Sequence, residues 1–220
     1  KEEARLFLII LGVAIWLVAI NLKMSGHSAS LASGLRESFL PVHAIGSTPG
    51  YGNGTDWDQW PLFSQWVLMI LMVFGGCAGS TAGGIKLHRV LLFARILRHE
   101  ITHLFRPQQV FRTHLDGQQI DRDGQMQLMS YLGLVAAIML VSMAVISLIE
   151  PSIGDMNTAF GSVIATFLNI GPGFGAVGPT DNFGHFGSGS LLFLSFLMLL
   201  GRLEIMVVIA LFSRTLWQRY

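Results

Sequence analysis

Hydrophobic residues fall into four long runs separated by polar or glycine-rich segments. The runs cover residues 6–22, 62–97, 128–149 and 190–217, and a glycine-rich stretch interrupts the second of them. A membrane-spanning helix needs roughly 20 consecutive apolar residues, with a range of about 17–25. The pattern therefore predicts four spans, of which the second is broken.

Two shorter helical stretches, Leu31 to Ala44 and Asn157 to Leu168, each precede a glycine-rich loop. Neither is long enough to cross a bilayer, so the pattern predicts that both are re-entrant. Each half of the chain then has the order span, short helix, loop, span. This order predicts an all-α membrane protein made of two parallel helix–pore loop–helix repeats, in which a Gly-rich loop breaks the second helix of the first repeat.

The predicted organisation is one repeat at residues 1–97, a cytoplasmic linker at 98–127 and a second repeat at 128–220. Within the linker, Asp116-Gly117 separates two short polar-apolar stretches, which indicates a small hairpin.

Positive charge is distributed unevenly along the chain. Residues 150–189 contain no Lys or Arg, whereas 86–127 and both chain ends are basic. The basic residues of these segments are Lys1, Arg5, Lys86, Arg89, Arg95, Arg98, Arg106, Arg112, Arg122, Arg214 and Arg219. The positive-inside rule therefore predicts that both termini and the linker are cytoplasmic.

The composition agrees with a membrane protein. Apolar residues make up 52% of the chain and charged residues 12%, against about 25% charged residues in soluble proteins. A net charge of +1 gives no electrostatic support for nucleic-acid binding. No nucleophile, base and oxyanion set is recognisable, so an enzyme is not expected, and neither is a covalently bound cofactor. The chain has no starting Met, and we expect a fragment of a longer protein.

The first glycine-rich loop contains Thr48-Pro49-Gly50-Tyr51-Gly52, which matches the potassium-channel filter pattern T-V-G-Y-G except for Pro in place of Val. A filter replaces the hydration shell of K⁺ with rings of backbone carbonyls. Glycine adopts positive φ without a Cβ clash, and so lets successive carbonyls turn to one side. The C-terminal end of the preceding short helix carries partial negative charge, which favours a cation.

The second loop, Asn169-Ile170-Gly171-Pro172-Gly173, is a looser version of the same pattern. Two such loops, each after a short helix and before a span, favour an ion filter over the alternative that the glycines only permit tight turns. The predicted site binds K⁺ through backbone carbonyls, and no other metal is expected. Its residues are Ser47, Thr48, Pro49, Gly50, Leu168, Asn169, Ile170 and Gly171.

A third glycine-rich run lies inside the second hydrophobic segment. Five of the ten residues from 75 to 84 are glycine, and each costs about 1 kcal/mol relative to Ala in a helix interior. The run predicts a broken helix at membrane depth, where free backbone is tolerated only inside protein or beside water. Helix packing through G-x-x-x-G pairs is the alternative. The candidate gate residues are Gly75, Gly76, Gly79, Ser80, Thr81, Gly83, Gly84 and Arg202. Arg202 joins them because a cation within an apolar span indicates function or a structural ion pair with Glu204.

Three blocks, at residues 48–52, 75–86 and 169–184, together resemble the TrkH/TrkG type of potassium-uptake subunit in the Trk/Ktr/HKT superfamily. The resemblance covers essentially the whole chain, as the third and fourth of four repeats. It implies a K⁺-channel-like fold in which Gly50 and Gly171 each supply a filter position. It also implies that the 75–84 loop gates the pore below the filter and is contacted by Arg202.

The function implied by the resemblance is K⁺ uptake across the bacterial inner membrane. The implied partners are membrane lipid, the N-terminal half of the same protein, a second copy in a homodimer, and a cytoplasmic nucleotide-binding subunit of TrkA type. The first two repeats of the family are absent, so a non-conducting fragment or assembly partner is one alternative. A solute carrier with broken helices is another, although such carriers have inverted repeats.

Overall fold

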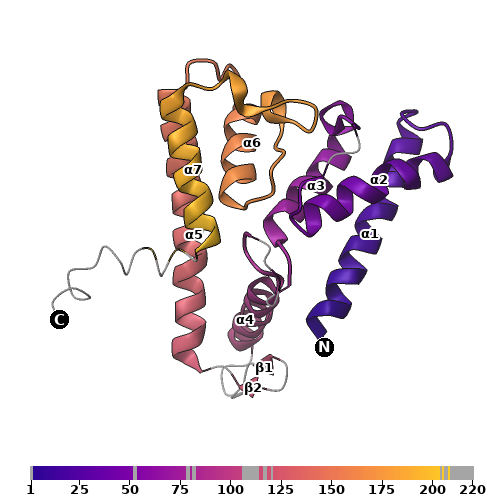
Figure 1. Ribbon diagram of the computed structural model, residues 1–220. Coiled ribbons are helices and arrows are strands. Elements are labelled where there is room, and N and C mark those ends of the chain that lie inside the picture. The colour runs from indigo at the N-terminus through magenta and orange to yellow at the C-terminus, as the bar shows by residue number, and fades with distance from the viewer. Residues whose placement is uncertain are drawn as a thin grey trace.

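The computed structural model describes residues 2–51, 54–77, 80, 83–105, 114–115, 118–119, 121–203, 205 and 208, and the regular secondary structure of this part is helical apart from one small hairpin (Figure 1). The first half contains helices α1 (Glu2–Met24), α2 (Leu31–Gly46) and α3 (Leu62–Phe74), with a 3₁₀ turn η1 (Trp57–Gln59) before α3. The second half contains α5 (Arg122–Ile149), α6 (Met156–Phe167) and α7 (Ser188–Arg202), with 3₁₀ turns η2 (Gly175–Val177) and η3 (Phe183–His185) before α7.

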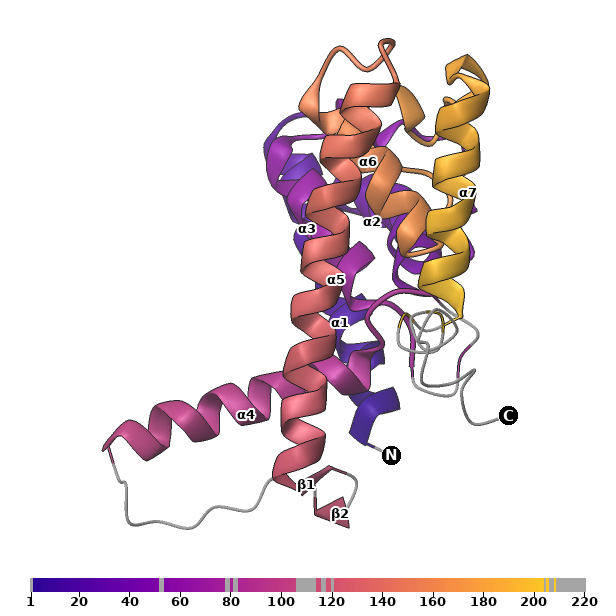
Figure 2. The same cartoon turned by 90° about the vertical axis from the view of Figure 1, so that its left-hand side faces the viewer.

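Helix α4 (Leu87–Phe105) and a small antiparallel hairpin, β1 (His114–Leu115) with β2 (Gln118–Gln119), join the halves. The hairpin is where the sequence predicts one. The long helices α1 and α5 both rise from the end of the molecule that carries the hairpin, and α3 and α7 both run back toward it (Figure 1). Helix α4 leaves the bundle sideways (Figure 2).

Helices α1 and α5 are long and apolar enough to cross a membrane, whereas α3 and α7 are apolar but shorter. The second predicted span is two helices, α3 and α4, because the chain leaves helical conformation after Phe74. The fourth predicted span is described as helix α7 only to Arg202. Helix α4 continues past the apolar run to Phe105, and α5 begins at Arg122 before its apolar run. Polar residues extend both helices because a helix needs backbone bonds rather than hydrophobicity to continue.

The short helix α2 begins at a capping box. The Ser30 side chain accepts from Ser33 N–H at 3.1 Å, and Ser33 Oγ accepts from Ser30 N–H at 3.0 Å, which satisfies two free donors of the first turn. The helix packs on α1 at Gly34, where an added Cβ would lie 2.9 Å from the Ala19 carbonyl oxygen. The absence of a side chain at Gly34 thus lets the two backbones approach closely.

Glu150 caps helix α7 from the end of α5. The N-cap residue of α7, Gly187, has no side chain to cap with, and its N–H donates to Glu150 Oε2 at 2.7 Å. The hydroxyl of Ser152 donates to Glu150 Oε1 at 2.8 Å. The Gly187 N–H first, and then the Ser152 hydroxyl, hold the pKa of Glu150 well below its usual range. The carboxylate therefore fixes the top of α7 beside the top of α5.

Helix α7 meets the end of α6 at Gly201. A Cβ at this position would overlap the Phe167 carbonyl oxygen and lie 3.0 Å from Asn169 Nδ2. The contact lets α7 rest directly on the backbone that leads into the second glycine-rich loop.

We predict that Gly201→Ala lowers the melting temperature of the purified protein, because α7 must move away from Phe167. Overpacking of this kind costs typically about 1–3 kcal/mol. Gly133→Ala in α5 is the matched control: nothing in the described part of the chain lies within 4 Å of the added Cβ, and Ala is favoured over Gly in a helix by about 0.5–1 kcal/mol. Thermal unfolding in detergent measures both. Equal melting of Gly201→Ala and Gly133→Ala would contradict the close contact.

Candidate functional site

The two glycine-rich loops have positive φ at the same two positions. Thr48 and Asn169 have φ of 62° and 55°, and Gly50 and Gly171 have φ of 69° and 110°. Left-handed backbone is rare at non-glycine residues, yet it occurs at the same offset in both loops. The pattern is a structural repeat at the positions where the sequence predicts a filter.

The same hydrogen bond closes each loop onto its short helix. Gly50 N–H donates to the Ala44 carbonyl at 3.2 Å, and Gly171 N–H donates to the Ala165 carbonyl at 3.4 Å. Both acceptors lie in the last turn of a helix, α2 or α6, where carbonyls lack helical partners. The start of each loop is therefore held against the last turn of its short helix.

The two loops touch each other through Gly50. A Cβ at Gly50 would overlap the Ile170 carbonyl oxygen and lie 3.0 Å from Pro172 Cδ, and a Cβ at Gly171 would lie 3.9 Å from the Gly50 Cα. The structure thus brings the two predicted filter loops together, although 121 residues separate Gly50 from Gly171. Among the eight predicted filter residues, the buried side chains are Thr48, Leu168 and Ile170, and Ser47, Pro49 and Gly171 are exposed.

The break in the second span is a loop that closes on itself. Helix α3 ends at Gly75, whose φ is 55°. A Cβ there would lie 2.8 Å from the Gly83 carbonyl oxygen and 3.2 Å from that of Ile85. Leu87 N–H donates to the Gly76 carbonyl at 3.1 Å across the break. The described residues of the run are therefore non-helical and compact.

This loop reaches the second predicted filter loop at Gly83, where an added Cβ would overlap the Leu168 carbonyl oxygen and lie 2.7 Å from Asn169 Cβ. Asn169 also binds α7, because its Nδ2 donates to the Met198 carbonyl at 3.0 Å. The predicted gate loop, the second predicted filter loop and α7 thus meet at Asn169. Gly79 and Thr81, two predicted gate residues, lie outside the described residues.

Arg202 ends helix α7 one residue after Gly201, and its side chain is exposed. Since the residue is exposed, neither α5 nor α6 covers it in this chain. No side-chain hydrogen bond joins Arg202 to another described residue. Residues 78–79 and 81–82 of the gate loop lie outside the described part, so the contact between Arg202 and that loop stays a prediction.

The sequence reasoning missed the turn η1. Trp57 is fully buried, and its Nε1 donates to the Gly173 carbonyl at 3.3 Å, across 116 residues. The side chain of Asp56 caps the turn by accepting from Asp58 N–H at 3.1 Å. Asn182 caps η3 in the same way. Residues Asp56–Trp60 and Asn182–Phe186 share one pattern, in which a polar capping residue is followed by an aromatic residue, two further residues and a second aromatic residue. This pattern could have identified both turns as equivalent elements of the two halves.

Asp58 is a half-buried carboxyl beside the second loop, outside the membrane-spanning helices. Burial and repulsion from Asp56 raise its pKa to about 6, although a hydrogen bond from Gly175 N–H opposes the rise. Asp181 and Asp155 add further repulsion. In the described part of the chain, no group of three His, Cys, Asp or Glu side chains could hold a metal ion. His27, His43 and His185 form none.

The chain matches a family model described as TrkH, cation transport protein, over residues 3–219. It is similar to the Trk system potassium uptake protein TrkH of Salmonella typhimurium, with 32% identity over 219 residues, 98% of this chain but 44% of that protein. Trk system potassium uptake protein TrkG of Escherichia coli is 32% identical over 187 residues, 84% of this chain and 38% of that protein.

The crystal structure of the potassium transporter TrkH from Vibrio parahaemolyticus superposes with a TM-score of 0.87 at 28% identity, covering 98% of this chain and 45% of that one. The chain spans less than half the length of the curated relatives it matches.

We predict that Asp58→Asn stabilises the protein at neutral pH. The folded-state pKa of about 6 lies above the ordinary aspartate value of 3.8, so the stability of the wild type falls as the pH rises from 4 to 6 and stays low above it. The variant avoids this loss, about 1 kcal/mol once solvent screening of a half-exposed group is allowed for. Melting temperature measured from pH 4 to 8 checks the prediction. Asp181→Asn removes only one of the smaller repulsions on Asp58, so its profile should keep most of the fall between pH 4 and 6. Parallel profiles for Asp58→Asn and wild type would contradict it.

Proposed function

The chain belongs to the TrkH family of cation transport proteins, and we propose on that premise that it forms two of the four pore-lining repeats of a bacterial potassium-uptake protein. The curated relatives are Trk potassium uptake proteins, which supports K⁺ as the transported ion. Transport takes place across the inner membrane, with both chain termini cytoplasmic, as the distribution of Lys and Arg favours. Since α1 and α5 point the same way, the two repeats are parallel rather than inverted (Figure 1).

The contact between the two glycine-rich loops carries this proposal. Gly50 packs directly on the backbone of Ile170 and Gly171, and each loop follows the carboxyl end of a short helix. Those ends carry partial negative charge, and positive-φ backbone lets carbonyls turn toward one ion. The loop residues from Ser47 to Gly50 and from Leu168 to Gly171 supply the ion-binding carbonyls.

Two loops supply only half of the ring of carbonyls that would surround an ion. The remaining two loops come from two further repeats, which the longer relatives have room for. We call the assembly of this chain with those repeats the four-repeat protein. This chain alone is then non-conducting. A second copy of the four-repeat protein and a TrkA-type nucleotide-binding subunit on the basic cytoplasmic face are its proposed partners.

The glycine-rich break between α3 and α4 is the proposed gate. Gly83 lies against Leu168 and Asn169, which are filter residues in this proposal. A conformational change of the loop therefore alters the backbone at the point where ions leave the filter. Free backbone groups are tolerated at membrane depth only inside protein or beside water, and Gly75, Gly76 and Gly83 of the loop are buried. Arg202, one residue beyond the Gly201 contact, can donate to carbonyls of that loop and hold it in place.

We predict that Gly50→Ser in the four-repeat protein reduces K⁺ over Na⁺ discrimination roughly tenfold, because a Cβ in left-handed backbone costs about 1–2 kcal/mol. Gly171→Ser should reduce it less, since its Cβ would have only one neighbour among the described residues, at 3.9 Å. Gly54→Ser is the control: φ is 77°, but no atom of the described residues lies within 4 Å of the added Cβ. Uptake of ⁸⁶Rb⁺ with Na⁺ competition measures all three. Wild-type selectivity in both filter variants would rule this ion site out.

We predict that removing residues 76–83 raises K⁺ flux and leaves selectivity largely intact, because the filter loops remain and the obstruction goes. Arg202→Ala should act in the same direction, since each charge-assisted bond to the loop is worth about 1.5–3 kcal/mol. Arg95→Ala is the control: Arg95 lies in α4 and forms an ion pair with Glu2 of α1 at 2.7 Å. Flux into liposomes is compared after size-exclusion chromatography. Folded variants with wild-type flux would show that the run only packs helices.

A further inference from the structure

The second filter loop is held in part by the first half of the chain. Trp57 of η1 donates through Nε1 to the Gly173 carbonyl at 3.3 Å. Gly173 N–H in turn donates to the Val177 carbonyl at 2.7 Å, which closes residues 173–177 into a turn. The indole therefore binds the first residue of that turn, two positions beyond Gly171.

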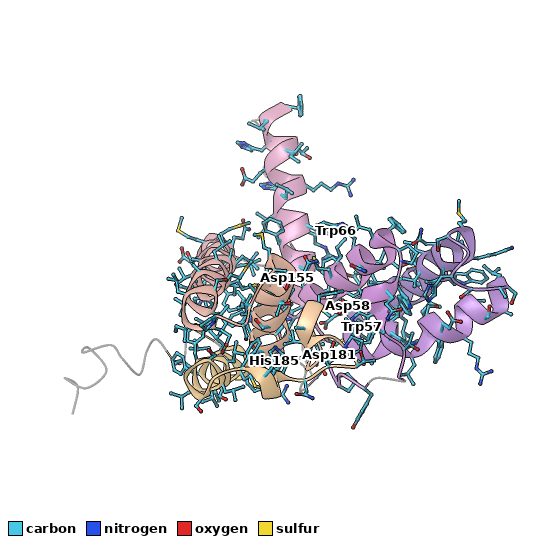
Figure 3. The ribbon with its side chains drawn as sticks, turned by 90° about the horizontal axis from the view of Figure 1, so that it is seen from above. Trp57, Asp58, Trp66, Asp155, Asp181 and His185 are labelled. Atoms are coloured by element: carbon cyan, nitrogen blue, oxygen red, sulfur yellow. The ribbon has the colours of Figure 1, made fainter. Side chains whose placement is uncertain are left out.

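Asp58, the next residue of η1, holds the other end of the same turn. Gly175 N–H donates to its carboxylate. A Cβ at Gly178 would overlap Asp58 Oδ2, so the backbone of Gly178 lies flush on the carboxylate. Figure 3 looks down on this boundary, where Trp57 and Asp58 lie between the helices of the two halves. A cavity of about 170 Å³ beside them is lined by Asp58, Gln65, Met69, Asn157, Phe160, Phe174 and Gly175.

Helix α6 also supports the turn. A Cβ at Gly173 would lie 2.5 Å from the Gly161 carbonyl oxygen. Ala176 N–H donates to Thr158 Oγ1 at 3.0 Å. The turn is thus fixed between its own pore helix and the η1 turn of the neighbouring repeat. Contacts with α6 belong to the same repeat, whereas Trp57 and Asp58 belong to the other.

The corresponding turn of the second half is built differently. Phe183 lies 126 residues after Trp57, at the same place after a capping Asx residue. The phenylalanine side chain has no N–H to donate, and Phe183 is only partly buried, whereas Trp57 is fully buried. The donor at this position is therefore a feature of the first half rather than a requirement of the turn.

We propose that Trp57 and Asp58 are positioning residues that clamp residues 173–178 across the repeat boundary and thereby set the ion selectivity of the second filter loop. The inference rests on the proposed filter function. Neither side chain touches the ion. Both side chains fix the backbone that follows Ile170 and Gly171. The carbonyls of the filter loop therefore keep their spacing, although neither side chain bonds to them.

Trp57→Phe tests the indole bond in the four-repeat protein. It keeps the buried ring and removes one N–H···O bond, so K⁺ over Na⁺ discrimination should fall roughly three- to tenfold with total ⁸⁶Rb⁺ uptake retained. Trp60→Phe is the matched control: Trp60 is 3% exposed, and its Nε1 has no acceptor in the described part of the chain. It should keep wild-type selectivity. Equal selectivity in the two variants would overturn the proposal.

Asp58 gives a second, independent test. Asp58→Ala removes the acceptor for Gly175 N–H and should lower selectivity as Trp57→Phe does. Asp58→Asn keeps an acceptor oxygen and should restore most of it. Asp181→Ala removes a neighbouring carboxylate that has no side-chain bond to the turn, and should leave selectivity unchanged. If Asp58→Ala and Asp58→Asn behave alike, or if Asp181→Ala matches Asp58→Ala, bulk charge rather than the clamp sets selectivity and the proposal fails.

Amide hydrogen exchange separates failure of the clamp from failure of the proposed function. Trp57→Phe should increase exchange of the amides at residues 173–178, whereas Trp60→Phe should leave them protected. This readout needs no transport. A wild type that transports no K⁺ but shows the exchange difference would overturn the filter function and keep the clamp contact. A wild type that transports K⁺ with no exchange difference would overturn the clamp and keep the filter.

Discussion

A loop that enters a membrane without helical hydrogen bonds must have its backbone polar groups satisfied by the protein itself. The chain meets this constraint twice in the same way, by folding each glycine-rich loop back onto its short helix at Ala44 or Ala165. The constraint also explains the density of glycine. Backbone can lie against backbone only where no Cβ intervenes, as at Gly50 and Gly201. Most other contacts of the proposed ion site follow from these approaches.

The two loops share a conformation but not a support. Both carry positive φ at equivalent residues, so the local construction is repeated. The second loop has in addition a longer return segment, whose turn is fixed by α6 on one side and by Trp57 on the other. The two loops can therefore keep one local geometry although each is packed against different neighbouring residues.

Asp58 illustrates how stability and a positioning role conflict. Its charge is disfavoured by burial and by three nearby carboxylates, which lowers stability at neutral pH. The same carboxylate holds Gly175 N–H. A residue that weakens the fold while fixing a functional loop is what a trade-off between stability and activity predicts.

Sequence alone determined the order of the elements, the break after Phe74 and the two loops with their glycines, because hydrophobic period, segment length and glycine content are local properties. It did not determine which distant residues meet. The contacts of Gly83 with Leu168 and of Trp57 with Gly173 join residues that are 85 and 116 positions apart, and only packing of α3, α6 and η1 brings them together. The exposed position of Arg202 was decided in the same way, since burial depends on which helices lie beside α7 rather than on the apolar residues around it.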